Sequence, residues 1–203
     1  MNYLALGDSY TIGEGVPETG RWPMQLARAL RAEGFDIADP RIIAQTGWTT
    51  DELSAAMDAA EPLGQFDFVS LAIGVNNQYR GRDVAEYREQ FAGLLDRAIG
   101  LAGGRADRVL VLSIPDWGVT PFATAQGRDT AQIASQLDAY NAAAAEVSGH
   151  RGVAFVDVTE ASRFRGADPM MLAKDGLHPS QTMYSLWAAR AYHAVARLLG
   201  EKP

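Results

Sequence analysis

The stretch Tyr3-Leu4-Ala5-Leu6-Gly7-Asp8-Ser9-Tyr10-Thr11 opens with an apolar run and then turns abruptly small and polar. A continuous apolar run is typical of a strand that is buried on both faces of a parallel sheet. Four more short apolar runs occur further along the chain, at residues 41–44, 66–73, 109–114 and 153–158. We therefore predict five short strands, the first of which covers residues 3–6.

Stretches with helical spacing separate these runs, at residues 22–33, 50–60, 83–99, 129–147 and 179–199. Strands that alternate with helices need crossover connections, which predict an α/β fold with a five-stranded parallel sheet and helices on both faces. Two longer connections, residues 115–128 and 159–177, are predicted to be irregular. Such segments serve as lids or binding loops, or are surface excursions without a role.

Length and composition limit the classes of protein to consider. The 203 residues fit one domain or at most two small ones, and no repeat, linker or low-complexity tract divides them, so we predict a single domain over residues 1–203. An apolar share of 47% and a charged share of 21% are those of a globular protein. With no cysteine, the chain has no disulfide, cysteine nucleophile or thiolate metal site.

The charge and the apolar stretches bear on partners and location. A formal net charge of −7 disfavours nucleic acid as a partner. The longest apolar stretch, residues 182–199, carries Arg190, His193 and Arg197, so we expect no membrane insertion. The N-terminus has no basic region before a long apolar run, which predicts a cytoplasmic protein. With three histidines, a histidine-rich zinc site is not expected, and we predict neither a metal nor a cofactor.

Of the three histidines, His178 is the best candidate for a catalytic base. His193 shares a helix face with two arginines, and His150 precedes the fifth strand, at the edge of the sheet opposite to ligand sites. His178 lies in a turn three residues after Asp175, and a carboxylate placed there can fix the imidazole tautomer. Taken alone, this pair also fits a turn-capping Asp beside an incidental His.

Candidate partners for this base follow the ends of the first three strands. Ser9 is a candidate nucleophile, and its own N–H, the N–H of Gly47 and the side-chain amide of Asn76 could stabilise an oxyanion. Each has a simpler explanation: a helix-capping Ser, a turn Gly and a left-handed loop Asn. Together, however, they supply complementary roles at the sheet edge where parallel sheets bind ligands, which favours a catalytic site.

With Ser9, Gly47, Asn76 and His178 in this order, the chain resembles the SGNH hydrolases, also called the GDSL esterase/lipase family. Gly7-Asp8-Ser9, Gly47, Gly74-x-Asn76 and Asp175-x-x-His178 are similar to the family's sequence blocks. The resemblance implies a flavodoxin-like three-layer α/β/α sandwich, a serine-ester mechanism without a metal, and an oxyanion hole made by Ser9, Gly47 and Asn76. Two positions differ from the family pattern: Tyr10 replaces Leu, and Asn77 replaces Asp.

The resulting hypothesis is a serine esterase with Ser9, His178 and Asp175 as its triad and a small-molecule ester as its substrate. Short acyl esters, lysophospholipids, thioesters and acetylated sugars are all considered. One alternative is an acyltransferase with the same triad. Another is a flavodoxin-like binding module, either for FMN, with residues 9–13 as a weak phosphate loop, or of the phosphoryl-receiver type. Four aromatic residues follow strand ends and could line a substrate pocket or pack loops instead: Trp48, Tyr79, Trp117 and Phe122.

Overall fold

The computed structural model describes residues 1–200 and contains one sheet of five parallel strands. The strands are β1 (Tyr3–Gly7), β2 (Arg41–Ala44), β3 (Phe68–Ala72), β4 (Val109–Leu112) and β5 (Ala154–Val156), and their order in the sheet is β2-β1-β3-β4-β5. All neighbouring strands pair in parallel. This is the doubly wound order, in which the chain reverses direction across the sheet between β1 and β3.

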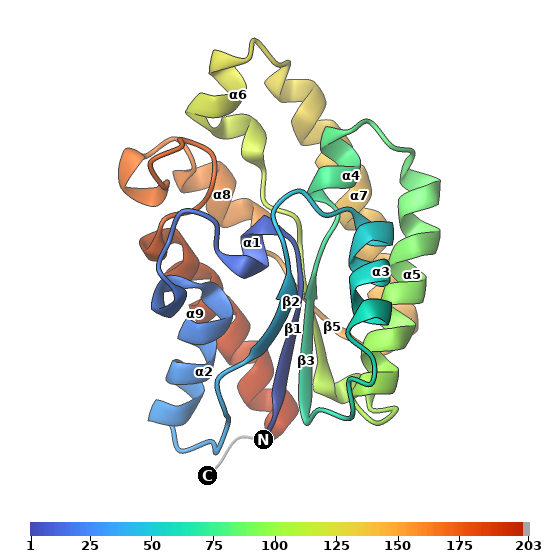
Figure 1. Cartoon of the computed structure of the whole chain (residues 1–203). Coiled ribbons are helices and arrows are strands. Elements are labelled where there is room, and N and C mark those ends of the chain that lie inside the picture. The colour runs from blue at the N-terminus through green and yellow to red at the C-terminus, as the bar shows by residue number, and fades with distance from the viewer. Residues whose placement is uncertain (201–203) are drawn as a thin grey trace.

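Helices cover both faces of the sheet (Figure 1). One face carries α2 (Trp22–Ala32) and α9 (Gln181–Leu199), which pack against each other. The other carries α3 (Thr50–Ala59), α5 (Val84–Leu101) and α7 (Thr130–His150). The predicted three-layer α/β/α sandwich with five parallel strands is therefore confirmed.

The core lies on both sides of the central strands. Every residue of β1 and β4 is buried, and Leu4, Leu6 and Phe68 have no exposed surface. Burial on both faces explains why these strands are continuous apolar runs rather than alternating ones. The Tyr3 hydroxyl is a polar group in this core, and it forms a 2.9 Å hydrogen bond with the hydroxyl of Ser70.

The two long connections are not irregular throughout, so this part of the prediction was wrong. The first contains a 3-10 turn (Trp117–Val119) and α6 (Pro121–Ala125), and the second contains α8 (Thr159–Arg165) and a 3-10 turn (Pro169–Met171). Helices of this length complete fewer than two turns, so their sequences show no helical period. Side-chain caps begin some of them: Thr120 accepts from the N–H of Ala123, and Asp168 from the N–H of Met170.

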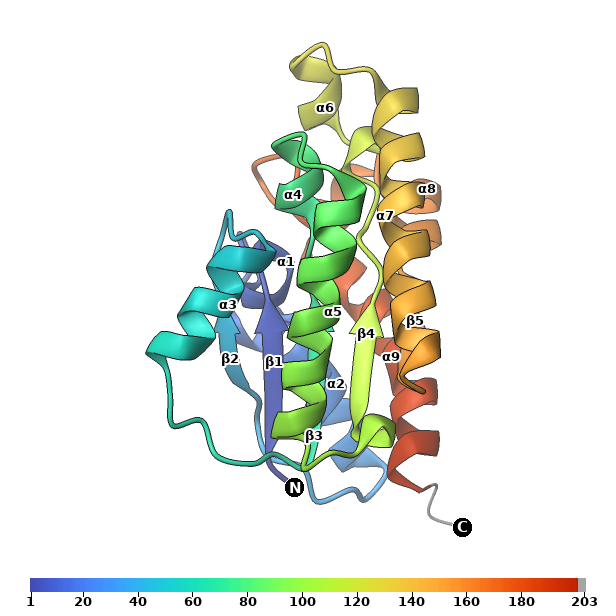
Figure 2. The same ribbon diagram turned by 90° about the vertical axis from the view of Figure 1, so that its right-hand side faces the viewer.

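Two more short helices, α1 (Ser9–Ile12) and α4 (Val75–Tyr79), begin almost directly after β1 and β3. Figure 2 shows that the strand arrows point toward the end of the molecule where α1, α4 and α6 lie. The carboxyl ends of the strands therefore lie beside a group of short helices, and the N-terminus lies at the opposite end of the molecule. Within residues 1–200, no helix is both long and apolar enough to span a membrane.

Candidate active site

The turn after β1 presents Ser9 at the carboxyl edge of the sheet. A Cβ atom on Gly7 would lie 2.2 Å from Oγ1 of Thr11 and 2.5 Å from the carbonyl oxygen of Ala72, so only glycine fits this close approach. Asp8 then caps α1, because its carboxylate accepts the N–H of Tyr10 at 3.0 Å. Ser9 is the first residue of α1 and lines a cavity at the end of the strand.

Asp8 is a buried carboxyl group beside this turn. Burial raises its pKa to about 7, although hydrogen bonds from the backbone N–H groups of Tyr10, Asp8 itself and Gly74 act in the opposite direction. The cost of removing a carboxylate from water therefore exceeds the gain from these N–H donors. The group next to Ser9 consequently changes its charge near neutral pH.

The loop after β2 carries Gly47 at the rim of the same cavity. Its φ of 90° lies in the left-handed region, which explains the need for glycine. The carbonyl oxygen of Gly47 accepts a 2.7 Å hydrogen bond from Nη2 of Arg80, and Nη1 of Arg80 lies 3.1 Å from Glu52. Within residues 1–200, the backbone N–H groups of Ser9 and Gly47 have no hydrogen-bond acceptor in the protein.

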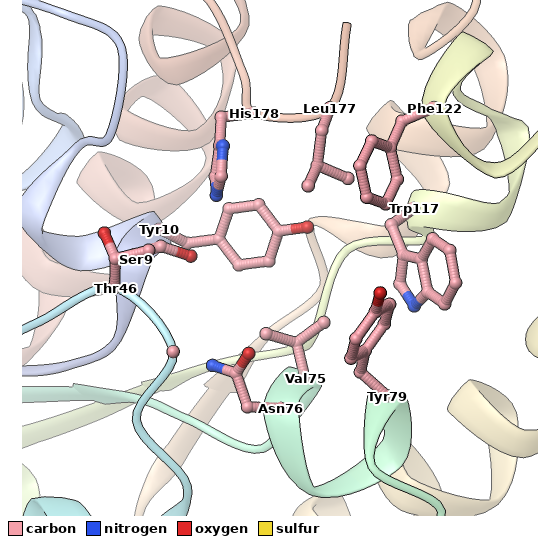
Figure 3. Close-up of a pocket in the computed structure, with 11 residues that line it drawn as sticks. Ser9, Tyr10, Thr46, Val75, Asn76, Tyr79, Trp117, Phe122, Leu177 and His178 are labelled. Carbon is pink, nitrogen blue, oxygen red and sulfur yellow. The ribbon is translucent and has the colours of Figure 1, made fainter. Parts of the chain in front are cut away.

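Asn76 follows the end of β3 in α4. Gly74 lies just before this helix with a φ of 130°, and a Cβ atom there would lie 2.5 Å from the ring of Tyr87. The amide nitrogen of Asn76 donates to the carbonyl oxygen of Trp48 at 2.9 Å. Figure 3 shows this nitrogen on the side of the cavity where Ser9 and Thr46 lie. Asn76 is not left-handed, since no non-glycine residue within 1–200 has a positive φ.

Asn77, the position that differs from the family pattern, has a structural contact instead. Its side chain is fully buried, accepts from the N–H of Thr50 at 3.1 Å and donates to the hydroxyl of Thr50 at 2.7 Å. Thr50 is the first residue of α3. Asn77 therefore joins α4 to the start of α3, and its amide points away from the cavity that Asn76 lines.

A tight loop brings Asp175 onto His178. Oδ2 of Asp175 lies 2.6 Å from Nδ1 of His178, and Oδ1 accepts the backbone N–H groups of Leu177 at 2.9 Å and His178 at 3.0 Å. Gly176 permits this turn with a φ of 69°. Burial alone would raise the pKa of Asp175, but these hydrogen bonds and the charge of His178 hold it below its usual value. At neutral pH the carboxylate is therefore ionised and can accept the Nδ1 proton of the imidazole in a hydrogen bond.

The turn after β1, the loop after β2, the start of α4 and the loop before α9 meet around one cavity of about 230 Å³. Figure 3 shows His178 above Ser9 at one end and aromatic rings at the other. The lining residues are Ser9, Tyr10, Thr46, Gly47, Val75, Asn76, Tyr79, Trp117, Phe122, Leu177 and His178. The cavity thus has a polar end with a hydroxyl, an imidazole and amide donors, and an apolar end.

The apolar end contains three of the four predicted aromatic residues. The ring centroids of Tyr79 and Trp117 lie 5.3 Å apart, and those of Trp117 and Phe122 lie 6.4 Å apart. The guanidinium of Arg128 lies 5.2 Å from the Tyr79 ring centre and 5.3 Å from that of Trp117. The fourth, Trp48, does not line the cavity: its side chain packs against the core, and only its carbonyl oxygen contacts the site, through Asn76.

The other two histidines lie outside the cavity. His193 is exposed on α9, and His150 is the exposed last residue of α7, before the amino end of β5. Among residues 1–200, no group of three or more His, Cys, Asp or Glu side chains could hold a metal ion.

Four residues that line the cavity were not predicted from the sequence to do so: Tyr10, Thr46, Val75 and Leu177. Each is the sequence neighbour of a predicted residue, at Ser9, Gly47, Asn76 and His178 respectively. That adjacency is the signal that could have found them. Arg80, which holds the Gly47 loop through a carbonyl oxygen, follows the predicted residue Tyr79, but nothing in the sequence pairs it with Gly47.

A five-stranded doubly wound sheet with this cavity at its carboxyl edge is an α/β fold whose candidate site lies where such sheets bind ligands. The family model described as "GDSL-like Lipase/Acylhydrolase family" matches residues 5–186, and the chain belongs to this family. The resemblance seen in the sequence is thereby confirmed, and the enzyme is favoured over the flavodoxin-like binding module.

Solved structures of similar fold cover nearly the whole chain. TesA is 20% identical, with a TM-score of 0.75, and the match covers 98% of this chain and 99% of TesA. The lipase/acylhydrolase from Enterococcus faecalis is 23% identical over 100% of both chains, with a TM-score of 0.74. The psychrotrophic esterase EstA from Pseudoalteromonas sp. is 17% identical over 98% of both chains, with a TM-score of 0.74. No curated protein matches the chain significantly.

Proposed function

We propose that this hydrolase cleaves carboxylic esters through an acyl-enzyme formed on Ser9. The observation that carries the proposal is the 2.6 Å contact between Asp175 and His178 at the cavity that Ser9 also lines. An imidazole held in this way keeps its proton on Nδ1 and leaves Nε2 free to accept one. Residues 1–203 would act as one catalytic domain, which the family match over residues 5–186 supports.

In the first half of the reaction, Oγ of Ser9 attacks the acyl carbon and its proton passes to Nε2 of His178. No hydrogen bond joins Ser9 to His178 within the described residues 1–200, and such contacts commonly tighten only when substrate binds. The tetrahedral intermediate collapses, the bond to the alcohol oxygen breaks, and His178 returns the proton to that oxygen. The acyl group is then bonded to Ser9.

In the second half, water attacks the acyl carbon and gives a proton to His178. The second intermediate collapses, the carboxylic acid leaves, and Oγ of Ser9 regains its proton. In both intermediates the oxyanion accepts from the backbone N–H groups of Ser9 and Gly47 and from the side chain of Asn76. The two backbone donors have no acceptor in the described protein, so they are available without reorganisation.

The two ends of the cavity suggest where each part of the ester lies. The aromatic end, with Tyr79, Trp117 and Phe122, suits the acyl group, since it offers apolar surface. The polar end opens beside Thr46, whose side chain is exposed, and suits the alcohol. Short acyl esters, lysophospholipid-like esters and acetylated sugars fit this division. An acetyl xylan esterase, AlAXEase, is among the proteins of similar fold.

The proposal is tested by following acid release from p-nitrophenyl esters and one thioester, with and without an added alcohol. Acid release at the same rate in both conditions is expected for a hydrolase. A new ester made from the added alcohol would indicate an acyltransferase with the same triad. No release from any ester would contradict the proposed function. We also propose a cytoplasmic location, which cell fractionation tests.

A further inference from the structure

Tyr10 follows Ser9 directly in α1 and occupies the middle of the site. Only 6% of its surface is exposed. Its ring packs edge-on against His178 and against Trp187, with both pairs of ring centroids 5.8 Å apart. Figure 3 shows the ring crossing the cavity between Leu177 and Val75, with its hydroxyl pointing toward the aromatic end. The residue after Ser9 therefore faces the space assigned to the acyl group.

Tyr10 also lies between the active-site cavity and two small voids beside it. One void, of about 20 Å³, is lined by Tyr10, Trp187 and Met183 among others, and the second, of about 10 Å³, by Tyr10, Trp187 and Ile73 among others. Of the residues that line these three spaces, within residues 1–200, Tyr10 alone lines all three. A shorter side chain at this position would join the voids to the active-site cavity.

The hydroxyl of Tyr10 is the second relevant feature. Within the described residues it has no hydrogen-bond partner. By contrast, the indole N–H of Trp117 donates to Gln78 at 2.8 Å, so it is already used. Burial, and then the charges of Asp8, Asp116 and Asp175, raise the pKa of Tyr10 above its ordinary value. The phenol therefore keeps its proton and can act as a donor toward the apolar end.

We propose that Tyr10 sets the acyl specificity of this enzyme, because its ring forms a wall of the acyl cavity toward the two neighbouring voids and its hydroxyl presents a hydrogen-bond donor to the aromatic end. The substrate class is an ester of a short acid whose acyl chain carries an acceptor oxygen, such as a keto or hydroxyl oxygen. This inference rests on the proposed function. The cavity of about 230 Å³ is below the range of roughly 300–1,000 Å³ usual for drug-sized ligands, in keeping with a short acyl group.

The test uses Tyr10→Leu, which removes the wall, and Tyr10→Phe, which removes only the hydroxyl. Chain length is probed with p-nitrophenyl esters from acetate to decanoate. The acceptor is probed with a pair of nearly equal shape, the 4-oxopentanoate and the 4-methylpentanoate. Tyr184→Leu is the matched control, since Tyr184 is also buried and packs on Trp187, but lines none of the three spaces.

Tyr10→Leu is expected to raise the ratio of kcat/KM for octanoate over butyrate by about tenfold, the effect of one or two methylenes of pocket contact. Tyr10→Phe should keep that ratio and lower the preference for the 4-oxo ester about fivefold, as for one lost hydrogen bond. Tyr184→Leu should change neither ratio. If turnover of Tyr10→Leu is too slow to follow, labelling rates with ethyl and octyl fluorophosphonates give the same comparison.

An active wild type whose length ratio is unchanged in Tyr10→Leu would overturn the role of Tyr10 as a wall. An unchanged preference for the 4-oxo ester in Tyr10→Phe would overturn its role as a donor. A wild type that cleaves no ester and is not labelled would instead contradict the proposed function itself, so the two failures are distinguishable.

Discussion

Nδ1 of His178 lies 2.6 Å from Oδ2 of Asp175, although the two residues are only three positions apart. The loop is short enough that the same carboxylate also accepts the backbone N–H groups of Leu177 and His178. Asp175 is therefore held by its own loop rather than by a distant element. The carboxylate and the imidazole that it orients thus belong to one loop of four residues, 175–178.

The first prediction concerns this pair. Asp175→Asn keeps the size of the side chain but places an amide where the imidazole donates, which favours the tautomer with its proton on the wrong nitrogen. We expect kcat to fall by about 10³–10⁴-fold, the scale for loss of the orienting carboxylate in a serine triad. Steady-state kinetics and the melting temperature check this. Near-normal turnover in a folded variant would show that Asp175 does not orient the base.

The second prediction separates the two adjacent asparagines. Asn76→Ala should lower kcat by about 10²–10³-fold, which corresponds to roughly 2.7–4 kcal/mol, with little change in KM, because the lost donor acts on the oxyanion. Asn77→Ala should instead lower the melting temperature, since Asn77 joins α4 to Thr50 at the start of α3. A loss of kcat in Asn76→Ala that merely tracks unfolding would contradict the donor role.

The third prediction concerns Arg80, which binds the carbonyl oxygen of Gly47 and thereby positions the loop. Arg80→Met should lower kcat up to about 10²-fold, the cost of a displacement near 1 Å, and leave KM nearly unchanged. Arg80→Lys should recover part of the rate, since one donor returns. The matched control is Arg82→Met, which removes an ion pair with Asp51 on α3 but no contact with the Gly47 loop. Equal rates in both Met variants would exclude the positioning role.

The fourth prediction is a pH dependence of stability at Asp8. The pKa of this carboxyl is about 7 in the folded protein and about 3.9 in an unfolded chain, so the folded state holds its proton more tightly. As the pH rises from about 4 to about 7, the contribution of Asp8 to stability therefore falls. The side chain in Asp8→Asn cannot lose a proton. The free energy of unfolding of this variant, relative to that of the wild type, should therefore increase from about pH 4 to about pH 7. Urea titrations at several pH values measure the difference, and parallel pH curves would rule out the titration of Asp8.

Much of the fold could be predicted because buried parallel strands leave a plain pattern. The runs at residues 3–6 and 41–44 match β1 and β2 closely. The run at 66–73 is longer than β3, because residues 66, 67 and 73 lie outside the segment 68–72 that pairs with β1. The short helices α6 and α8 could not be predicted, because five to seven residues show no period.

The sequence predicted where the residues of the candidate site lie in the fold better than it predicted which way their side chains point. The ends of β1, β2 and β3 bring Ser9, Gly47 and Asn76 to one cavity, as the topology of a parallel sheet requires, and the loop before α9 adds His178. Which way a side chain points depends on packing that a single sequence does not contain. Trp48 and Tyr10 illustrate this: both follow strand ends, yet Trp48 packs against the core while Tyr10 lines the cavity.

The most direct test of the central claim is the site of covalent labelling by a fluorophosphonate, mapped by mass spectrometry of peptides. One adduct is expected, on the peptide that contains Ser9, and none on heat-denatured protein. Ser9→Ala should abolish both labelling and ester hydrolysis while keeping the melting temperature of the wild type. An adduct on another residue, or ester hydrolysis that persists in Ser9→Ala, would contradict the proposal that Ser9 is the nucleophile.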